Sequence, residues 1–180
     1  MRLDSTDGAE LEIVPSRYEY AGTAVDQLDL DWDANWLVIR GRVRAPDGST
    51  YGFLDPCLTT WEALELARWL ETVASGTAKA SESDNEPALT FTEPNLGFGL
   101  GPASGDLVTV RAHFSLESTP PHHSWTELYD YSISLTMSAS DLAAAASQWR
   151  DEIAAFPVRG LPLPVSRARW RLRDLWTWKR

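Results

Sequence analysis

Cysteine is almost absent from this sequence, which has Cys57 alone among 180 residues. A single thiol excludes an internal disulfide and is typical of proteins that stay in a reducing compartment. No apolar run approaches the roughly 20 residues that span a bilayer. The opening stretch MRLDSTDGAELEIV also lacks the apolar core of a signal peptide. We therefore expect a cytoplasmic protein with no membrane span.

Basic side chains are scarce in most of the chain and concentrated at its end. Residues 1–157 carry 9 Lys and Arg against 25 Asp and Glu, a net charge of −16, whereas residues 158–180 carry 7 against 1, a net charge of +6. An acidic body repels nucleic acid and attracts basic partners. We expect a single domain at residues 1–159, which binds no nucleic acid, and a separate basic tail rich in Trp and Arg at residues 160–180.

Motifs of known active sites are missing as well. The sequence has no Gly-x-Ser-x-Gly elbow, and the glycine-rich residues 97–102 precede a strand pattern where a phosphate loop needs a helix. A calcium loop counted from Asp29 fits at Asp31 and Asp33, but Ala34 stands where that loop needs glycine. We expect no catalytic residue, no metal and no cofactor.

Histidine occurs three times, and all three copies lie close to one glutamate. His113, Glu117, His122 and His123 fall within eleven residues, and three such ligands would suit a zinc ion. Their spacing is not that of a zinc-protease helix, and the paired histidines follow a diproline in an expected loop. We favour surface histidines and keep a small metal-dependent enzyme at this region as an alternative function.

Alternation of apolar and polar residues dominates the body of the chain and predicts β-strands. Clean alternation with one wet face is typical of antiparallel sheets. In this pattern Tyr129 is expected to face the core and His113 the solvent. Asp-Gly turns close two of the expected hairpins. The strand patterns cover residues 1–6, 9–14, 35–44, 51–53, 88–92, 107–117 and 129–137.

Two segments carry helical spacing instead. Thr59 and Ser138 are each followed three residues later by an acidic side chain, which is the spacing of an N-terminal cap, and apolar stripes follow. We predict helices at about 60–75 and 139–156, each lying on a sheet surface. The order of strands, helix, strands and helix lacks βαβ alternation. It indicates an α+β fold, a mostly antiparallel β-sheet carrying two amphipathic helices.

Aspartate recurs at almost every second position in the stretch DLDWDANW, between and beside two tryptophans. Dense charge of one sign attracts a basic surface, and tryptophan is enriched where binding energy concentrates. By contrast, Trp61, Trp69 and Trp149 lie at helical positions and are expected in the core. The candidate partner-binding patch consists of Asp26, Asp29, Asp31, Trp32, Asp33 and Trp36.

The tail VSRARWRLRDLWTWKR has the spacing of a short basic amphipathic C-terminal helix. Its charge suits docking on the acidic body of the same chain or of a second copy, and we favour this self-association through the tail. Contact with a membrane surface, contact with nucleic acid and a frayed terminus stay open. An oligomerising intracellular scaffold protein is therefore a second alternative function.

Five phrases of the sequence form a distinctive set when they are read together. The phrases are DWDANWL (31–37), FLDPCLTTWEALELARWL (53–70), LTFTEPNLGFGL (89–100), HFSLESTPPHHSW (113–125) and AAFPVR (154–159). With these phrases the chain resembles the WapI family of bacterial immunity proteins. The resemblance covers about residues 1–159, and the tail lies outside it.

The resemblance implies a function that the composition alone does not reveal. Immunity proteins of this kind neutralise the toxic C-terminal domain of a wall-associated polymorphic toxin in bacterial competition. The family therefore implies a small cytoplasmic binding protein without catalysis, whose partner is a cognate toxin domain. A net charge of −16 in the body matches a basic toxin domain.

Overall fold

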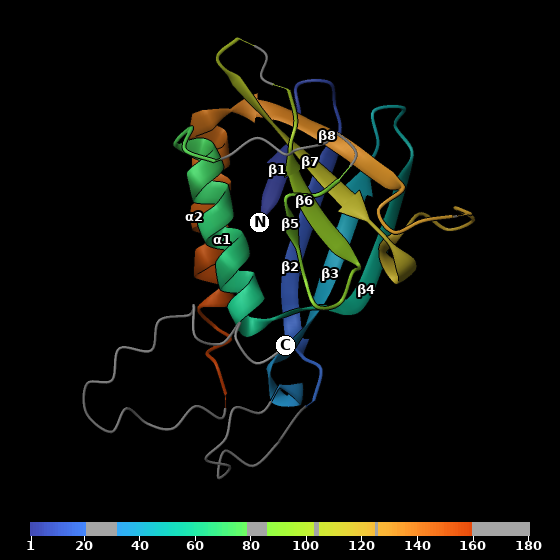
Figure 1. Cartoon of the computed structure of the whole chain (residues 1–180), viewed down its shortest axis with the longest axis vertical. Coiled ribbons are helices and arrows are strands. Elements are labelled where there is room, and N and C mark those ends of the chain that lie inside the picture. Colours follow the sequence, from blue (N-terminus) through green and yellow to red (C-terminus); the bar gives the residue numbers. More distant parts are fainter. Residues whose placement is uncertain (21–31, 79–85, 103–104, 125, 160–180) are drawn as a thin grey trace.

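The computed structural model describes residues 1–20, 32–78, 86–102, 105–124 and 126–159. Within these ranges the chain forms two four-stranded sheets and two long helices, and every pair of neighbouring strands is antiparallel (Figure 1). The predicted α+β class, mostly antiparallel sheet with two helices, is confirmed. The first sheet has the order β1 (Arg2–Asp4), β2 (Glu10–Tyr18), β3 (Trp36–Arg44), β4 (Thr50–Thr59); the second has β5 (Leu89–Thr90), β6 (Leu96–Leu100), β7 (Leu107–Phe114), β8 (Tyr131–Ser138).

The hairpin turns of the first sheet follow the sequence prediction. Gly8 and Gly48 adopt positive φ angles of 91° and 85°, a conformation that glycine reaches without a steric penalty. The turns from β1 to β2 and from β3 to β4 lie at the upper end of the molecule in Figure 1, where β6 also ends and β7 begins. Strand β3 therefore begins, and strand β4 finishes, at the opposite end.

Both helices begin at the predicted caps. Helix α1 (Thr60–Ala74) starts after Thr59, whose side chain accepts a hydrogen bond from the Glu62 backbone N–H, and helix α2 (Ala139–Ile153) starts after Ser138 in the same manner. Each helix ends slightly earlier than predicted, α1 before Gly76 at a φ of 70°. The predicted C-terminal helix lies outside the described residues. No helix in the described ranges combines the length and apolarity that crossing a membrane requires.

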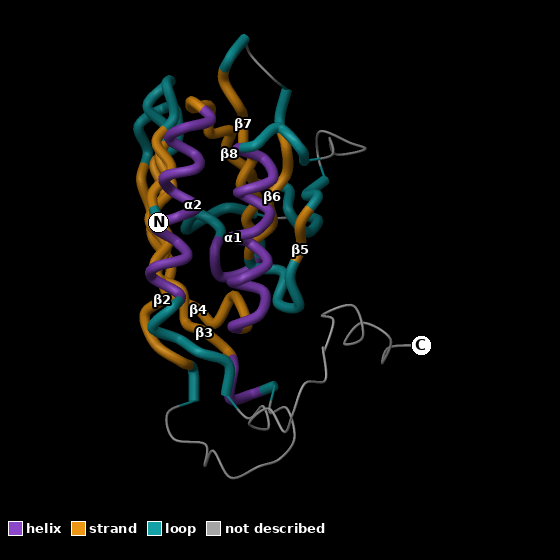
Figure 2. Tube along the Cα trace, turned by 90° about the vertical axis from the view of Figure 1, so that its left-hand side faces the viewer, coloured by secondary structure: helices purple, strands orange, loops and turns teal. Residues whose placement is uncertain are grey.

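Helices α1 and α2 pack side by side (Figure 2). The hydrophobic core fills the space between these helices and the two sheets. Trp149 of α2 is fully buried, and its indole N–H donates to the Ala63 carbonyl of α1 at 2.8 Å. Trp61 and Trp69 are half-buried, and Trp69 packs against the core. Of the three tryptophans predicted in the core, Trp149 is the fully buried one. The sheets meet where the Thr6 N–H donates to the Thr136 carbonyl of β8 at 2.9 Å.

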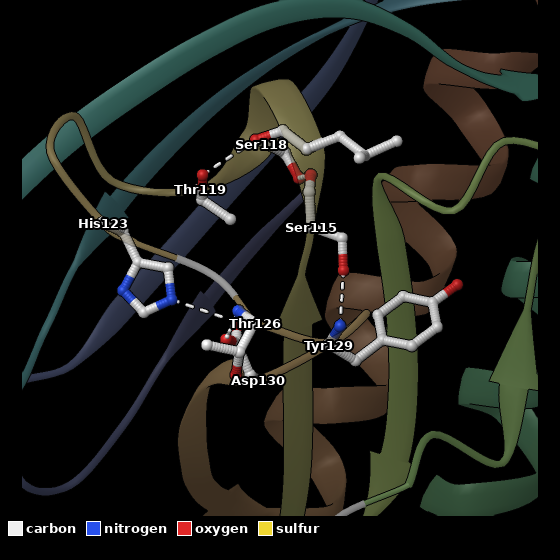
Figure 3. A network of polar contacts seen from close by, with 8 residues as sticks. Ser115, Ser118, Thr119, His123, Thr126, Tyr129 and Asp130 are labelled. Atoms are coloured by element: carbon white, nitrogen blue, oxygen red, sulfur yellow. Dashed lines mark hydrogen bonds and ion pairs between the residues drawn. The ribbon is translucent and has the colours of Figure 1, made fainter.

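Strand β7 departs from the predicted alternation because both of its faces are covered. His113 was expected to face the solvent, but only 1% of its surface is exposed. Tyr129, expected in the core, precedes β8 at a φ of 65° and stands edge-on to His113 on the outer face, with 6.2 Å between the ring centroids. Figure 3 shows the Tyr129 N–H donating to Ser115 Oγ, which fixes this arrangement. Both expectations are wrong, since a loop folding back over the sheet replaces the solvent.

Candidate functional site: an acidic pocket

A pocket of about 310 Å³ opens at the end of the molecule where β3 begins and β4 approaches α1. Four of its lining residues are acidic, and none of those that the structure describes there is basic. Negative charge is therefore concentrated at this place. We call it the acidic pocket, lined by Glu19, Trp36, Asp55, Pro56, Glu93, Asn95 and Glu117.

The first sheet positions one side of the acidic pocket. Trp36 opens β3, and its carbonyl accepts a hydrogen bond from the Glu19 N–H at 2.8 Å. Asp55 and Pro56 lie on β4, where the register with β3 shifts between Leu37 and Val38. An irregularity of this kind re-aims side chains, and it also tolerates a proline that cannot donate a ladder hydrogen bond.

The loop between β5 and β6 forms the opposite side, and a buried glutamate of α1 holds it. Glu62 Oε2 accepts hydrogen bonds from the backbone N–H and the hydroxyl of Thr59, both at 2.8 Å, and so caps the helix. Its Oε1 accepts the Thr92 N–H at 2.7 Å. Glu93 therefore projects from a loop that is fastened directly to the start of α1.

The short helix η2 (Leu116–Ser118) closes the third side and carries Glu117. Leu116 adopts a φ of 51°, which turns the chain sharply after β7. The Asn95 carbonyl accepts the Ser115 N–H at 3.0 Å and the Ser118 hydroxyl. These bonds tie η2 to the same loop that carries Glu93.

Burial and a neighbouring carboxylate both act on Asp55 in the acidic pocket. Burial raises the pKa of Asp55, and the charge of Glu117 raises it further. The pKa of the buried Cys57 thiol is also raised, mainly by burial and then by Asp55, Glu117 and Glu93. A thiol held in its neutral form is a poor nucleophile, so Cys57 packs as an inert side chain.

One polar atom at the acidic pocket has no partner. Asn95 is buried, with 2% of its surface exposed, and its side-chain Oδ1 accepts no hydrogen bond from the residues that the structure describes. The other end of the amide reaches Glu117 Oε2 only at 3.5 Å. A buried acceptor without a donor is uncommon in folded proteins and calls for an explanation.

The histidine region does not assemble into a metal site. No group of three or more His, Cys, Asp or Glu side chains within the described ranges is placed to hold a metal ion. His113 is buried under Tyr129, and His123 pairs instead with Asp130, with 3.0 Å from Nε2 to Oδ1 (Figure 3). His122 is exposed, and Glu117 lines the acidic pocket. The geometry gives the metal-enzyme alternative no support.

The aspartate-rich patch predicted from the sequence falls partly beside the acidic pocket. Trp36 lines the pocket, and Asp33 is exposed on the short helix η1 (Asp33–Asn35). Trp32 is 47% exposed and stands edge-on to Trp61, with 4.6 Å between the ring centroids. The remaining members of the patch, Asp26, Asp29 and Asp31, lie outside the described residues.

Most of the acidic pocket was not predicted from the sequence. Its side chains come from separate segments, and none of them belongs to a recognisable motif. One signal was present, however: four of the five phrases that carry the family resemblance contribute to it. Those contributions are Trp36, Asp55 with Pro56, Glu93 with Asn95, and Glu117.

Asn35, the neighbour of Trp36 in the sequence, holds Arg159 close to the acidic pocket. Its side-chain amide donates to the Arg159 carbonyl at 2.9 Å and accepts the Arg159 N–H at 2.8 Å. Its Oδ1 also accepts the Thr60 hydroxyl at 2.9 Å. The Arg159 guanidinium lies 3.3 Å above the Tyr18 ring and donates to the Tyr20 carbonyl at 3.0 Å.

Comparison with known proteins gives one result. The family model described as the immunity protein WapI-like family matches residues 2–157. A search of curated proteins found no match. The matched range includes every residue of the acidic pocket and ends before the basic tail.

Proposed function

The chain belongs to the WapI-like immunity protein family, and from this premise we propose that it binds and neutralises a cognate bacterial toxin domain without catalysis. The acidic pocket is the observation that carries the proposal. Three half-buried carboxylates and an exposed one converge there without a basic neighbour among the described lining residues. An acidic site of this kind is suited to receive cationic groups of a partner protein.

Long-range electrostatics supports the same partner. Residues 1–157 carry a net charge of −16, and a field of that sign speeds association with a basic protein surface. Toxin domains that act on nucleic acid present basic substrate clefts because they bind phosphate backbones. A negatively charged protein that occupies such a cleft excludes the substrate without any chemical step.

The contact surface that we propose extends from the acidic pocket over the neighbouring aromatic side chains. Tyr20 and Trp32 are 48% and 47% exposed, and exposed aromatic residues are typical anchors of protein interfaces. We include the whole aspartate-rich patch, Asp26, Asp29, Asp31 and Asp33 together with both tryptophans. The binding domain in this proposal is residues 1–159, and its place of action is the cytoplasm of the cell that it protects.

Co-expression in bacteria tests the proposal. A candidate cognate toxin domain is expressed with the natural chain or with a pocket variant, Asp55→Asn, Glu93→Gln and Glu117→Gln combined. We expect the natural chain to restore growth and the pocket variant to fail.

A matched control removes the same charge at the other end of the molecule. Asp7→Asn, Asp47→Asn and Asp106→Asn combined change three turn residues, where asparagine is well tolerated. This far-end variant should still protect. Loss of protection in both variants would show that only total charge matters, and full protection by the pocket variant would remove the pocket from the mechanism.

A further inference from the structure

The outer face of the first sheet carries a line of exposed arginines on β3. Arg40, Arg42 and Arg44 alternate with buried residues along the strand, and all three side chains are exposed. No carboxylate of the described residues forms an ion pair with any of them. They are three of the 9 Lys and Arg in residues 1–157, whose net charge is −16. We call this line the arginine stripe, a concentrated positive charge on an acidic body.

Strand β2 presents the opposite charge beside the arginine stripe. Glu10 lies opposite Arg44 in the register of the two strands, and Glu12 follows two residues later, opposite the next arginine of the stripe. Both glutamates are half-buried on the outer face, and Glu10 pairs with Arg2 of β1, with 2.9 Å from Oε2 to Nη2. The face therefore has a positive strand next to a negative strand. Such a face is complementary to a two-fold copy of itself.

We infer that two copies of this chain associate through this outer face, about a two-fold axis parallel to the strands and midway between β2 and β3. Sheets that pack face to face keep their strand directions within about 30° of each other, and this axis satisfies that preference. The rotation lays β3 of one copy over β2 of the other without shifting positions along the strands. Arg44 of one copy then meets Glu10 of the second copy, and Arg42 meets Glu12 in the same way. Each contact occurs twice, because the interface is isologous.

The third arginine of the stripe meets an apolar side chain in this arrangement. Val14 is half-buried and lies opposite Arg40 in the register, so Arg40 of one copy lies over Val14 of the other. Arginine stems pack on apolar surface while the charged group stays in water. Leu54 stands on the other side of Arg40 and is 57% exposed. It widens the apolar end of the contact.

A second copy fits this face better than other partners do. The basic toxin domain of the proposed function would be repelled by the arginine stripe, so the inference goes beyond that function and does not rest on it. Nucleic acid would be repelled by the acidic body. Two acidic bodies repel each other least where their surface is not negative. On β1 to β3, four basic side chains, Arg2 and the stripe, stand beside three acidic ones, Asp4, Glu10 and Glu12.

Sedimentation velocity of the full chain tests the inference. At low ionic strength we expect a reversible monomer–dimer equilibrium with a Kd on the order of 10–100 μM, as suits a polar interface of modest size. Added salt should shift the equilibrium toward monomer, because exposed charge pairs are screened. A chain that stays monomeric up to about 1 mM, or a dimer that salt does not weaken, would overturn the inference.

Charge reversal on one strand at a time locates the contact. Arg42→Glu and Glu12→Arg each set like charges together twice across the two-fold axis, so each variant alone should dimerise at least about tenfold more weakly. Equal amounts of the two variants should associate as the natural chain does, because every mixed contact joins opposite charges again. Unchanged dimerisation of either variant alone, or no association in the mixture of folded variants, would overturn the inference.

A neutral variant keeps the test decisive if a reversal disturbs folding. Both reversals place like charges opposite each other within one sheet, which is destabilising. Arg42→Gln and Arg44→Gln combined avoid this repulsion. This variant should keep the circular dichroism of the natural chain and dimerise about tenfold more weakly. Unchanged dimerisation of this variant would overturn the inference.

Two controls separate the outer face from the rest of the chain. Arg68→Glu changes an exposed charge on α1 and should leave dimerisation as in the natural chain. The basic tail is the competing source of self-association, and a full-length tail variant should also dimerise normally; it combines Arg167→Gln, Arg169→Gln, Arg171→Gln and Arg173→Gln. Dimers lost in the tail variant but kept in Arg42→Glu would assign the association to the tail and overturn the inference. An equal loss in Arg68→Glu and Arg42→Glu would do so as well.

Discussion

Glu62 fastens the loop of the acidic pocket to helix α1, because its Oε1 accepts the Thr92 backbone N–H at 2.7 Å. The same carboxylate caps the helix through Thr59. Glu62 and Thr92 stand 30 positions apart in the chain. One buried side chain thus makes the position of Glu93 depend on the start of α1, and it couples local helix stability to the shape of the pocket.

Replacing Glu62 should therefore cost stability. Glu62→Ala removes three hydrogen bonds to a buried carboxylate, and we expect the free energy of unfolding to fall by about 2–4 kcal/mol. Urea denaturation followed by circular dichroism measures this change. Glu71→Ala is the control in the same helix, since it removes an exposed ion pair with Arg150 that is worth less than about 1 kcal/mol. Equal losses in both variants would contradict the role of Glu62.

The amide of Asn35 should be what holds Arg159 in place. In Asn35→Asp the Oδ1 acceptor remains, but the N–H donor to the Arg159 carbonyl is lost and a carboxylate faces that carbonyl instead. We expect the free energy of unfolding to fall by about 1–3 kcal/mol. Hydrogen exchange of the Arg159 amide should accelerate well beyond the effect on the core. An Arg159 amide as protected as in the natural chain would contradict this role.

Burial of His113 predicts a pH dependence of stability. Burial lowers the pKa of His113, and the nearby charge of Arg111 lowers it further, whereas an unfolded histidine titrates near pH 6.5. As the pH falls from about 7 toward 5, the unfolded chain takes up a proton that the folded chain resists, so stability falls. The loss is at most about 1.4 kcal/mol per pH unit for this one proton.

A phenylalanine at this position isolates the effect. His113→Phe keeps an aromatic ring against Tyr129 and should reduce the slope of unfolding free energy against pH between 5 and 7. Tyr129→Phe is the control, because burial raises the pKa of this tyrosine and keeps it neutral throughout that range. An identical slope for His113→Phe and the natural chain would rule out His113 as the source.

Local signals explain how much of the fold could be predicted. The caps at Thr59 and Ser138 involve residues three positions apart, so spacing alone located both helices. The covered face of β7 could not be predicted in this way. It depends on Tyr129 turning back at a positive φ from a loop that the strand pattern does not encode.

The candidate site was less predictable because it is assembled from distant parts of the chain. Trp36 was selected for its acidic neighbours, and it does line the acidic pocket. Asp55 and Glu93 look like ordinary surface carboxylates in the sequence. They come together only through the register of β3 with β4 and through the bond from Glu62 to Thr92.

The aspartate-rich patch and the acidic pocket should act on different steps of toxin binding. Neutralising the patch with Asp29→Asn, Asp31→Asn and Asp33→Asn should slow association and flatten its dependence on salt, since exposed charges steer encounter. Stopped-flow fluorescence at several salt concentrations measures both quantities. An association rate equal to that of the natural chain would exclude the patch from steering.

The dissociation rate of the complex with the cognate toxin domain tests the central claim most directly. It is measured for the natural chain, for the pocket variant and for the far-end variant, which lose three charges each. If the acidic pocket receives a cationic side chain of the toxin, dissociation of the pocket variant should accelerate about tenfold or more, and the far-end variant should dissociate like the natural chain. Equal dissociation rates for the two variants would contradict the account.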